Sequence, residues 1–200
     1  MINFLHKQRL LRKMRIVANG HPALRKKSEP IEEITESIRE LAQRMALTML
    51  KNEVVGVGIA APQVGINLRL IVVKTTGDDG RSRKDALPGE LLLDPLMPVA
   101  LVNPEIISAS GETDTCEEGC LSLPGVSGNV TRPTRVVLRA QMLDGKTVTA
   151  ECGGLLARCL QHEIDHLDGI LFYDHLSPEE QAKNAPTMKK LEKREQAHLH

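Results

Sequence analysis

The sequence predicts an α+β fold in which mostly antiparallel sheets pack around a central metal-binding helix, with an N-terminal and a C-terminal helix. Three observations support this prediction. Apolar residues recur at helical spacing in the flanking segments, most strand-like runs lie between those segments, and two of the runs flank a tight-turn signal. Strands that lie between helices and pair as hairpins are typical of α+β proteins.

The first predicted helix covers residues 32–53. Its apolar residues recur every three or four positions: Ile34, Ile38, Leu41, Met45 and Met49. Acidic residues crowd the start of this segment and Lys51 lies at its end, which matches the helix dipole.

Residues 54–65 are small and mostly apolar. Glycines at three positions disfavour a helix here and permit a close approach of the backbone: Gly56, Gly58 and Gly65. The next segment, "LRLIVVK" at residues 68–74, is nearly continuously apolar and predicts a buried strand.

Residues 75–98 begin with the polar run "TTGDDGRSRKD" and continue as an apolar stretch interrupted by Pro88 and Pro95. We expect a long loop that makes a surface excursion of the same domain.

Strand character resumes at residues 100–107. Two further predicted strands, residues 134–143 and 147–152, flank "DGK" at 144–146, a strong signal for a hairpin.

Two more helices are predicted in the last third of the chain. Residues 153–169 form the first, which Gly169 ends. Residues 177–200 open with Ser-Pro-Glu-Glu, a typical helix start, and predict the second.

The length of 200 residues suits one buried core better than two small ones. We expect a basic, disordered tail at residues 1–13, a single catalytic domain at 14–180 and a charged helical segment at 181–200.

Composition excludes several classes of protein. Basic and acidic residues balance at 26 each and aromatic residues make up 2%, which argues against binding nucleic acid by charge or by base stacking. No apolar run has the length of a membrane span. The first 13 residues lack the apolar core and cleavage site of a secretory signal, so we expect a cytoplasmic protein with reduced thiols.

The stretch "QHEIDHLDG" at residues 161–169 contains a metal-binding signature. His162 and His166 are one helical turn apart, about 6 Å along the axis, so both imidazoles can reach one ion. In the His-Glu-x-x-His pattern the intervening acid, here Glu163, acts on a metal-bound water.

The residues themselves leave the third ligand open. Phe172 occupies the position at which an extended zinc-protease pattern places a third histidine. Cys159 lies about 10 Å from His166 along the helix axis, too far for a short side chain. The remaining candidates are a downstream acid, Glu192 or Glu195, and the cysteines of "TCEEGCLSLPG": Cys116 and Cys120. Both cysteines together would make a closed structural site, whereas one would leave a coordination position open for catalysis.

Three stretches together resemble the peptide deformylase family. "GVGIAAPQ" at 56–63 is similar to its Gly-x-Gly-x-Ala-Ala-x-Gln motif, "EGCLS" at 118–122 is identical to its second motif, and "QHEIDH" at 161–166 matches its third. Order and spacing agree, and "HPALR" at 21–25 also looks like the opening segment of the family. The resemblance covers residues 14–180.

The resemblance implies that Cys120 is the third ligand, beside His162 and His166, with water in the fourth position. It implies one divalent metal ion, Fe(II) in first place, with Zn, Ni or Co as substitutes. It also implies that the enzyme hydrolyses the formyl group of N-formylmethionyl peptides emerging from ribosomes, with Glu163 moving the proton to the leaving amine.

Further roles follow from the same resemblance. The side-chain amide of Gln63 and the backbone N–H of Leu121 would stabilise the developing oxyanion. Gly56 and Gly58 would let the peptide lie against the backbone like an added strand. The methionine side chain would enter a pocket with three candidate residues: Val57, Leu155 and Cys159. Gln161 and Asp165 would support the ligands from behind.

The chain departs from the family pattern in two places. Residues 75–98 are longer than the equivalent loop in many members, which could reshape the substrate groove or be a tolerated insertion. Many members carry an arginine seven residues after the ligand cysteine, where this chain has Ser127. We expect either that Arg132 takes over peptide binding, or that peptide binding is weaker or differently ordered.

Two other functions remain open at this stage. A zinc endopeptidase would use the same helix and depend little on Cys120. A structural module would bind its ion through Cys116 as well, and would not need Glu163. The charged segment "KKLEKREQ" at 189–196 also suggests a contact with the ribosome.

Overall fold

The computed structural model of the chain describes residues 12–52, 56–75 and 86–199. Its centre is a five-stranded antiparallel sheet in the order β1-β2-β3-β6-β7. The strands are β1 (Gly58–Ala60), β2 (Leu70–Val73), β3 (Val99–Ala109), β6 (Arg135–Met142) and β7 (Thr147–Gly153). A separate two-stranded sheet pairs β4 (Thr113–Gly119) with β5 (Ser127–Pro133).

The central sheet is covered on both faces, which explains the continuous apolar run of β2. Ile71 and Val73 pack in the core cluster that contains the inner face of α4 (Gly154–Leu167). Leu70 and Val72 point the other way, into the cluster formed with α2 (Glu36–Leu50). Because side chains alternate along a strand, a strand between two layers needs apolar residues at every position.

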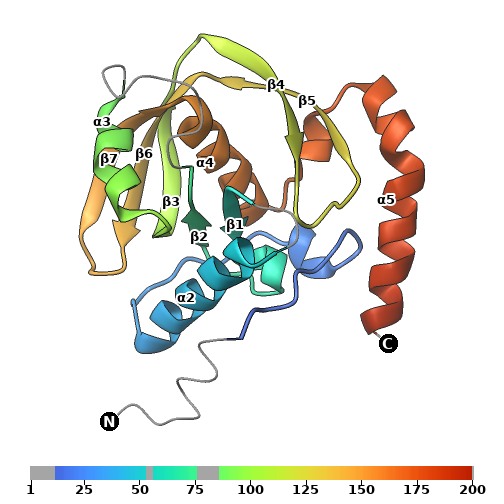
Figure 1. Cartoon of the computed structure of the whole chain (residues 1–200), viewed down its shortest axis with the longest axis horizontal. Coiled ribbons are helices and arrows are strands. Elements are labelled where there is room, and N and C mark those ends of the chain that lie inside the picture. Colours follow the sequence, from blue (N-terminus) through green and yellow to red (C-terminus); the bar gives the residue numbers. More distant parts are fainter. Residues whose placement is uncertain (1–11, 53–55, 76–85, 200) are drawn as a thin grey trace.

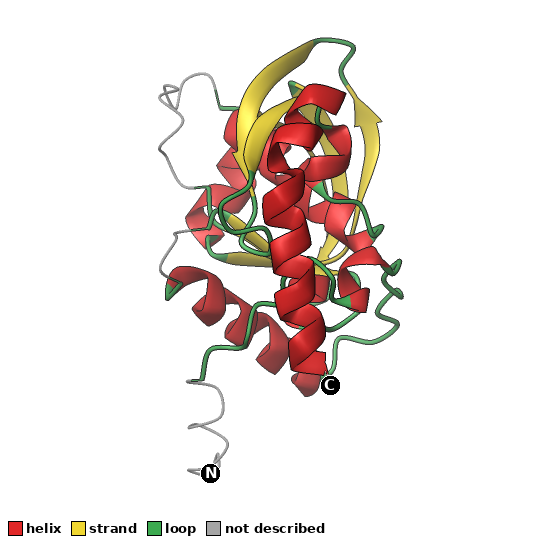
Figure 2. Ribbon diagram, turned by 90° about the vertical axis from the view of Figure 1, so that its right-hand side faces the viewer, coloured by secondary structure: helices red, strands yellow, loops and turns green. Residues whose placement is uncertain are grey.

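Helix α4 passes between the five-stranded sheet and the β4–β5 hairpin, as Figure 1 shows. Helix α5 (Pro178–Leu199) lies along the outer side of the hairpin and crosses one whole side of the molecule (Figure 2). A third core cluster contains Phe172, Met188, Leu191 and Val130 of β5. The metal-binding helix is therefore central, and the predicted α+β class is confirmed.

The hairpin predicted around residues 144–146 is present. Strands β6 and β7 pair from Arg135↔Gly153 to Gln141↔Thr147, and Gly145 adopts a left-handed φ of 87° in the turn. The predicted helices correspond to α2, α4 and α5, and the strands expected at 68–74 and 100–107 correspond to β2 and β3.

Two expectations were wrong or incomplete. The apolar part of the expected loop contains a helix, α3 (Pro88–Leu93), followed by the 3-10 helix η4 (Asp94–Leu96). The glycine-rich segment contains the strand β1 and a short 3-10 helix, η2 (Ala61–Val64), where we expected no helix. The hairpin β4–β5 was not predicted at all.

The C-terminal helix begins at Pro178, before the predicted segment boundary at residue 181. Most of the expected N-terminal tail lies outside the described residues. No helix of the described parts has the length and apolar character that crossing a membrane requires.

Candidate metal centre and active site

Helix α4 carries two of the predicted metal ligands. Its face towards the sheet is apolar and buried: Leu156, Leu160, Ile164 and Leu167. The histidines lie on another face, with ring centroids 5.0 Å apart and an edge-to-face arrangement. Phe172 stacks on His162 at 6.0 Å and so limits the orientation of that ring.

Cys120 reaches the histidines from the turn that follows β4. Its Sγ lies 3.2 Å from His166 Nε2, and the potential ligand atoms of Cys120, His162 and His166 all lie within 4.8 Å of one another. In the described parts of the chain, these three form the only group of ligand side chains with such proximity.

The alternative ligands lie elsewhere. Cys116 is exposed and its thiol donates to Asp114 Oδ2 at 3.7 Å. The Cys159 thiol donates to the Val57 carbonyl at 3.4 Å. Glu195, one of the two candidate acids, is buried on α5 and forms an ion pair with Arg15. The structure therefore supports a site with three protein ligands, Cys120, His162 and His166, and not a closed site that includes Cys116.

Glu118 orients His162 from behind, a role that the sequence did not indicate. Its Oε2 lies 2.9 Å from His162 Nδ1, so the other ring nitrogen, Nε2, faces the ligand group. Arg132 and Arg158 hold the same carboxylate at 2.6 and 2.8 Å. Burial alone would raise the pKa of Glu118, but hydrogen bonds from His162 and Arg132 outweigh it and keep the pKa well below its usual value.

The surroundings of His162 favour a positive charge. Burial lowers the pKa of this imidazole, but hydrogen bonds with Cys120 and Glu118 and the nearby Glu163 raise it well above its usual value. Burial lowers the pKa of His166 well below its usual value, which keeps that ring neutral. One thiol and two imidazoles beside buried carboxylates fit a divalent cation. The charge of such a cation can take the place of the proton on His162.

Glu163 lies beside this group and has the properties of a proton carrier. Burial raises the pKa of its carboxyl to about 7, although the charge on His162 opposes the shift. Its Oε2 is buried and has no hydrogen-bond partner in the described residues. A carboxyl with a pKa near neutrality can both accept and donate a proton at physiological pH.

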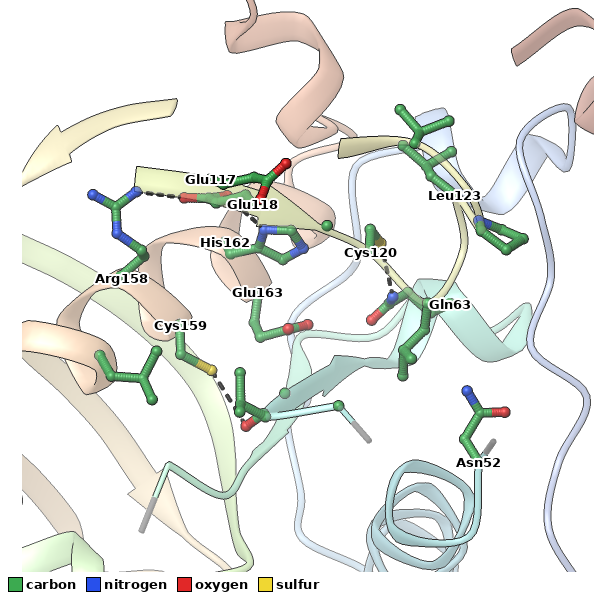
Figure 3. A pocket seen from close by; sticks show the side chains of 18 of the residues that line it. Asn52, Gln63, Glu117, Glu118, Cys120, Leu123, Arg158, Cys159, His162 and Glu163 are labelled. Carbon is green, nitrogen blue, oxygen red and sulfur yellow. Dashed lines mark hydrogen bonds and ion pairs between the residues drawn. The ribbon is translucent and has the colours of Figure 1, made fainter. Parts of the chain in front are cut away.

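Gln63 is held so that its amide nitrogen points into the site (Figure 3). Its Oε1 accepts a hydrogen bond from the Ala60 N–H at 2.8 Å, and its Nε2 lies 3.3 Å from Cys120 Sγ. The residue is buried in η2. Leu121 follows Cys120 in the turn, and its backbone N–H donates to no other described residue.

A cavity of about 470 Å³ opens beside the ligand group. The structure brings together all of the residues predicted for substrate binding except one. The lining includes Gly56, Val57, Gly58, Leu155 and Cys159, together with Gln63 and Leu121. Asn52, Glu117 and Arg158 also line it and were not predicted.

Arg132 is the exception. It is 5% exposed and lies outside the cavity lining, and its guanidinium contacts Glu118 at 2.6 Å and Asp165 at 2.8 Å. A guanidinium held by two carboxylates supports the site from behind, and the structure gives it no access to a peptide. Asp165 and Gln161 are also supporting residues: Asp165 binds Arg132, and Gln161 Nε2 donates to the Pro133 carbonyl at 3.0 Å.

Comparison with known proteins identifies the family. The family model of polypeptide deformylases matches residues 13–182. The chain belongs to the polypeptide deformylase family. A peptide deformylase of Bartonella bacilliformis is 43% identical over 173 residues, which cover 86% of this chain and 88% of the relative. A peptide deformylase of Hydrogenovibrio crunogenus is 44% identical over 165 residues, covering 82% and 86%.

Solved deformylase structures have the same fold. The structure from Legionella pneumophila is 38% identical with a TM-score of 0.74, and covers 93% of this chain and 98% of its own. The structure from Thermotoga maritima is 38% identical with a TM-score of 0.69, covering 84% and 99%.

Proposed function

We propose that this chain is a metal-dependent deformylase that removes the formyl group from N-terminal formylmethionine of newly made polypeptides and releases formate. The observation that carries the proposal is the grouping of the Cys120, His162 and His166 ligand atoms within 4.8 Å, at the wall of a cavity that Glu163 also lines. Membership of the deformylase family supports it independently.

The three ligands would hold one divalent ion, with Fe(II) as the first candidate and Zn, Ni or Co as substitutes. A thiolate and two imidazoles suit all of these ions. When bound, the ion supplies Lewis acidity, which lowers the pKa of a coordinated water towards neutrality.

Glu163 would carry the proton in both halves of the reaction. It accepts a proton from the attacking water, whose oxygen adds to the formyl carbon. It then delivers that proton to the peptide nitrogen as the C–N bond breaks, because an unprotonated amide anion is a poor leaving group. The products are formate and a free α-amine.

Two donors of this chain would stabilise the negative charge on the formyl oxygen. The Gln63 Nε2 is aimed at the site by the hydrogen bond that fixes its Oε1, and the Leu121 N–H is available in the turn. Donors that are positioned before the reaction stabilise developing charge without a cost of reorganisation.

The peptide would lie between the edges of two sheets. Strand β1 is at one edge of the five-stranded sheet, β4 belongs to the two-stranded sheet, and residues next to or within both line the cavity. Main-chain groups at such edges can pair with an extended peptide. The methionine side chain would then occupy the apolar part of the cavity, near Val57, Leu155 and Cys159.

We place this activity in the cytoplasm, where ribosomes deliver formylated chains. The charged outer face of α5 supports a contact with the ribosome, because Lys189, Lys190 and Lys193 are exposed on it.

Formate release from formyl-Met-Ala-Ser tests the proposed function, with protein purified without oxygen and loaded with Fe(II). Glu163→Ala should retain the metal and reduce kcat about 10²- to 10⁴-fold, because it removes the proton carrier. Cys120→Ser should lose both metal and activity. Cys116→Ser is the matched control and should keep both, since its thiol lies outside the ligand group.

Other results would favour the rival functions. Cleavage of internal peptide bonds that persists in Cys120→Ser would identify an endopeptidase. An inactive, metal-loaded parent whose ion is lost on Cys116→Ser as readily as on Cys120→Ser would identify a structural site.

A further inference from the structure

Arg158 lies on α4, one helical turn before His162, and joins this helix to both strands of the β4–β5 hairpin. Its Nη1 donates to Glu118 Oε1 at 2.8 Å and to the Val130 carbonyl at 3.0 Å. Its Nη2 donates to the backbone carbonyl of Asp114 at 3.1 Å and to the carboxylate of the same residue at 2.5 Å. The side chain is 12% exposed, so most of the guanidinium is withdrawn from solvent. Figure 3 shows it directed at Glu118.

The orientation of Glu118 does not require Arg158. Arg132 alone holds both oxygens of this carboxylate, with Nε on Oε1 at 2.6 Å and Nη2 on Oε2 at 3.1 Å. A bidentate pair of this kind fixes the position and the plane of a carboxylate. The distinct contribution of Arg158 therefore lies in its remaining contacts, which go to Asp114 and to the Val130 carbonyl.

Strand β4 and helix α4 run side by side in the same direction. Three contacts follow one another in the same order along both elements: Asp114 with Arg158, Glu118 with His162, and Cys120 with His166. The last contact is among the metal ligands, whereas the first is about 20 Å away along the strand, at about 3.3 Å per residue. In the described residues, no other side chain of α4 hydrogen-bonds to the first half of β4. Arg158 thus attaches the end of β4 that is remote from the metal site.

Other polar contacts attach the partner strand, β5, to the same helix. Arg132 Nη1 contacts Asp165 at 2.8 Å, and Gln161 Nε2 donates to the Pro133 carbonyl at 3.0 Å. Strand β5 does not carry Cys120. We therefore expect the hairpin to stay folded on α4 when Arg158 is replaced, while β4 gains freedom to shift along the helix.

We propose that Arg158 is a positioning residue that fixes β4 along α4 and so holds Cys120 at the two histidines, which slows the loss of the metal ion. The inference rests on the metal site of the proposed function and extends it to a residue outside the ligand set. Partners that orient ligands from outside typically change metal affinity by about 10- to 100-fold when they are replaced.

The experiment measures how fast the Co(II)-loaded enzyme loses its ion to excess EDTA. The thiolate-to-cobalt absorption reports the bond between Cys120 and the metal. Arg158→Met keeps an apolar stem but removes every hydrogen bond, and should release the ion about 10-fold faster. Arg158→Lys should fall between this variant and the parent, because a single ammonium cannot reach all of these acceptors.

Asp114 separates positioning from a change in the cavity wall. It is half exposed and lies outside the cavity lining, so Asp114→Ala removes a contact of Arg158 and leaves the wall intact. Release should be about two- to fivefold faster, as for the loss of an exposed ion pair. In the Arg158→Met background the same substitution should have little further effect, because the contact is already absent.

Arg69→Met is the matched control. Arg69 is also largely buried, and it contacts Asp168 after the end of α4 at 2.8 Å and the Pro104 carbonyl of β3 at 3.2 Å. It therefore joins α4 to another element without involving the hairpin. This variant should release the ion at the parent rate.

Metal release at the parent rate from Arg158→Met, with a raised KM for formyl-Met-Ala-Ser, would show that Arg158 only lines the cavity and would overturn the inference. Fully additive effects of Arg158→Met and Asp114→Ala would overturn it as well. If Arg158→Met does not fold, Arg158→Lys and Asp114→Ala decide the question: parent rates in both reject the inference.

Failure of the proposed function would appear differently. A metal-loaded parent that releases no formate would reject the activity, whereas the order of the metal-release rates would still support or reject the role of Arg158. A parent that retains no divalent ion would reject both.

Discussion

At position 58 the absence of a side chain determines where the Glu163 carboxylate can lie. A Cβ on Gly58 would collide with Glu163 Oε1 and come within 2.8 Å of the Cys159 Sγ. Both neighbours also line the cavity, so the Glu163 carboxylate could avoid this Cβ only by moving away from its present position. A residue without a side chain is therefore needed at position 58 for the Glu163 carboxylate to lie where it does.

Gly58→Ala should reduce kcat/KM for formyl-Met-Ala-Ser by about 100-fold, because a displacement of about 1 Å at a reacting group has an effect of that size. Metal content should stay at the parent level, since no ligand is moved. Gly111→Ala is the control, as a Cβ there meets nothing within 4 Å. Full activity of Gly58→Ala would show that Glu163 has more freedom than the packing indicates.

Individual residues differ in how far the sequence could predict them. His162, His166 and Glu163 follow from spacing on one helix, and Cys120 and Gln63 from motifs with a known pattern. Glu118 could not be predicted, because its contact with His162 depends on how β4 packs against α4. Arg132 was misassigned for the same reason: its guanidinium faces inwards, towards Glu118 and Asp165, and this direction is set by the pairing of β5 with β4.

Helix α3 is fastened to the rest of the domain by one buried carboxylate. Glu90 Oε1 accepts the Gly153 N–H at 2.6 Å, just before α4, and Oε2 accepts the Leu87 N–H at 2.6 Å. Gly89 packs so closely on Cys152 that a side chain there would collide with it. The start of the metal-binding helix and the start of α3 thus share one acceptor group.

Glu90→Ala should lower the free energy of unfolding by about 1–3 kcal/mol, because it leaves the Gly153 N–H buried without an acceptor. Urea unfolding followed by circular dichroism measures this change. Glu90→Gln retains one carbonyl acceptor and should lose less. A Glu90→Ala protein as stable as the parent would mean that water replaces the carboxylate.

The elements that the sequence analysis missed are short or polar. Pro88 was interpreted as a helix breaker, whereas it occupies the first turn of α3, a position that proline favours. A helix of six residues shows too little periodicity to be recognised. Strand β4 has one buried residue, Glu118, so it lacks the apolar alternation from which strands are predicted.

On the scale of the whole molecule, α5 connects strand β5 with the segment around Arg15 and Gly20 near the start of the described chain. Near its start, Glu180 accepts the Asn129 N–H of β5 at 2.9 Å. Near its end, Glu195 pairs with Arg15, and Gly20 packs against the backbone of Glu192. Met188 is buried in the third core cluster between these points.

A ribosome contact must therefore be tested by surface substitutions, because deleting the helix would expose the third core cluster. We expect Lys190→Glu combined with Lys193→Glu to leave unfolding and peptide turnover unchanged, since both residues are exposed. Cosedimentation with ribosomes should fall several-fold at low salt, because basic residues supply most of the attraction to RNA phosphates. Equal cosedimentation of the variant and the parent would reject this contact.

The position of β1 and β4 at sheet edges also limits how selective this enzyme can be. Nearly every residue offers the same backbone N–H and C=O groups. A strand edge that pairs with a peptide therefore recognises the main chain of the peptide and does not distinguish its side chains. In this binding mode, side-chain discrimination would be confined to the cavity beside the ligand group. Such a geometry suits an enzyme that acts on the N-termini of many different proteins. Its wide substrate range would come from main-chain contacts, which do not depend on the amino-acid sequence of the substrate.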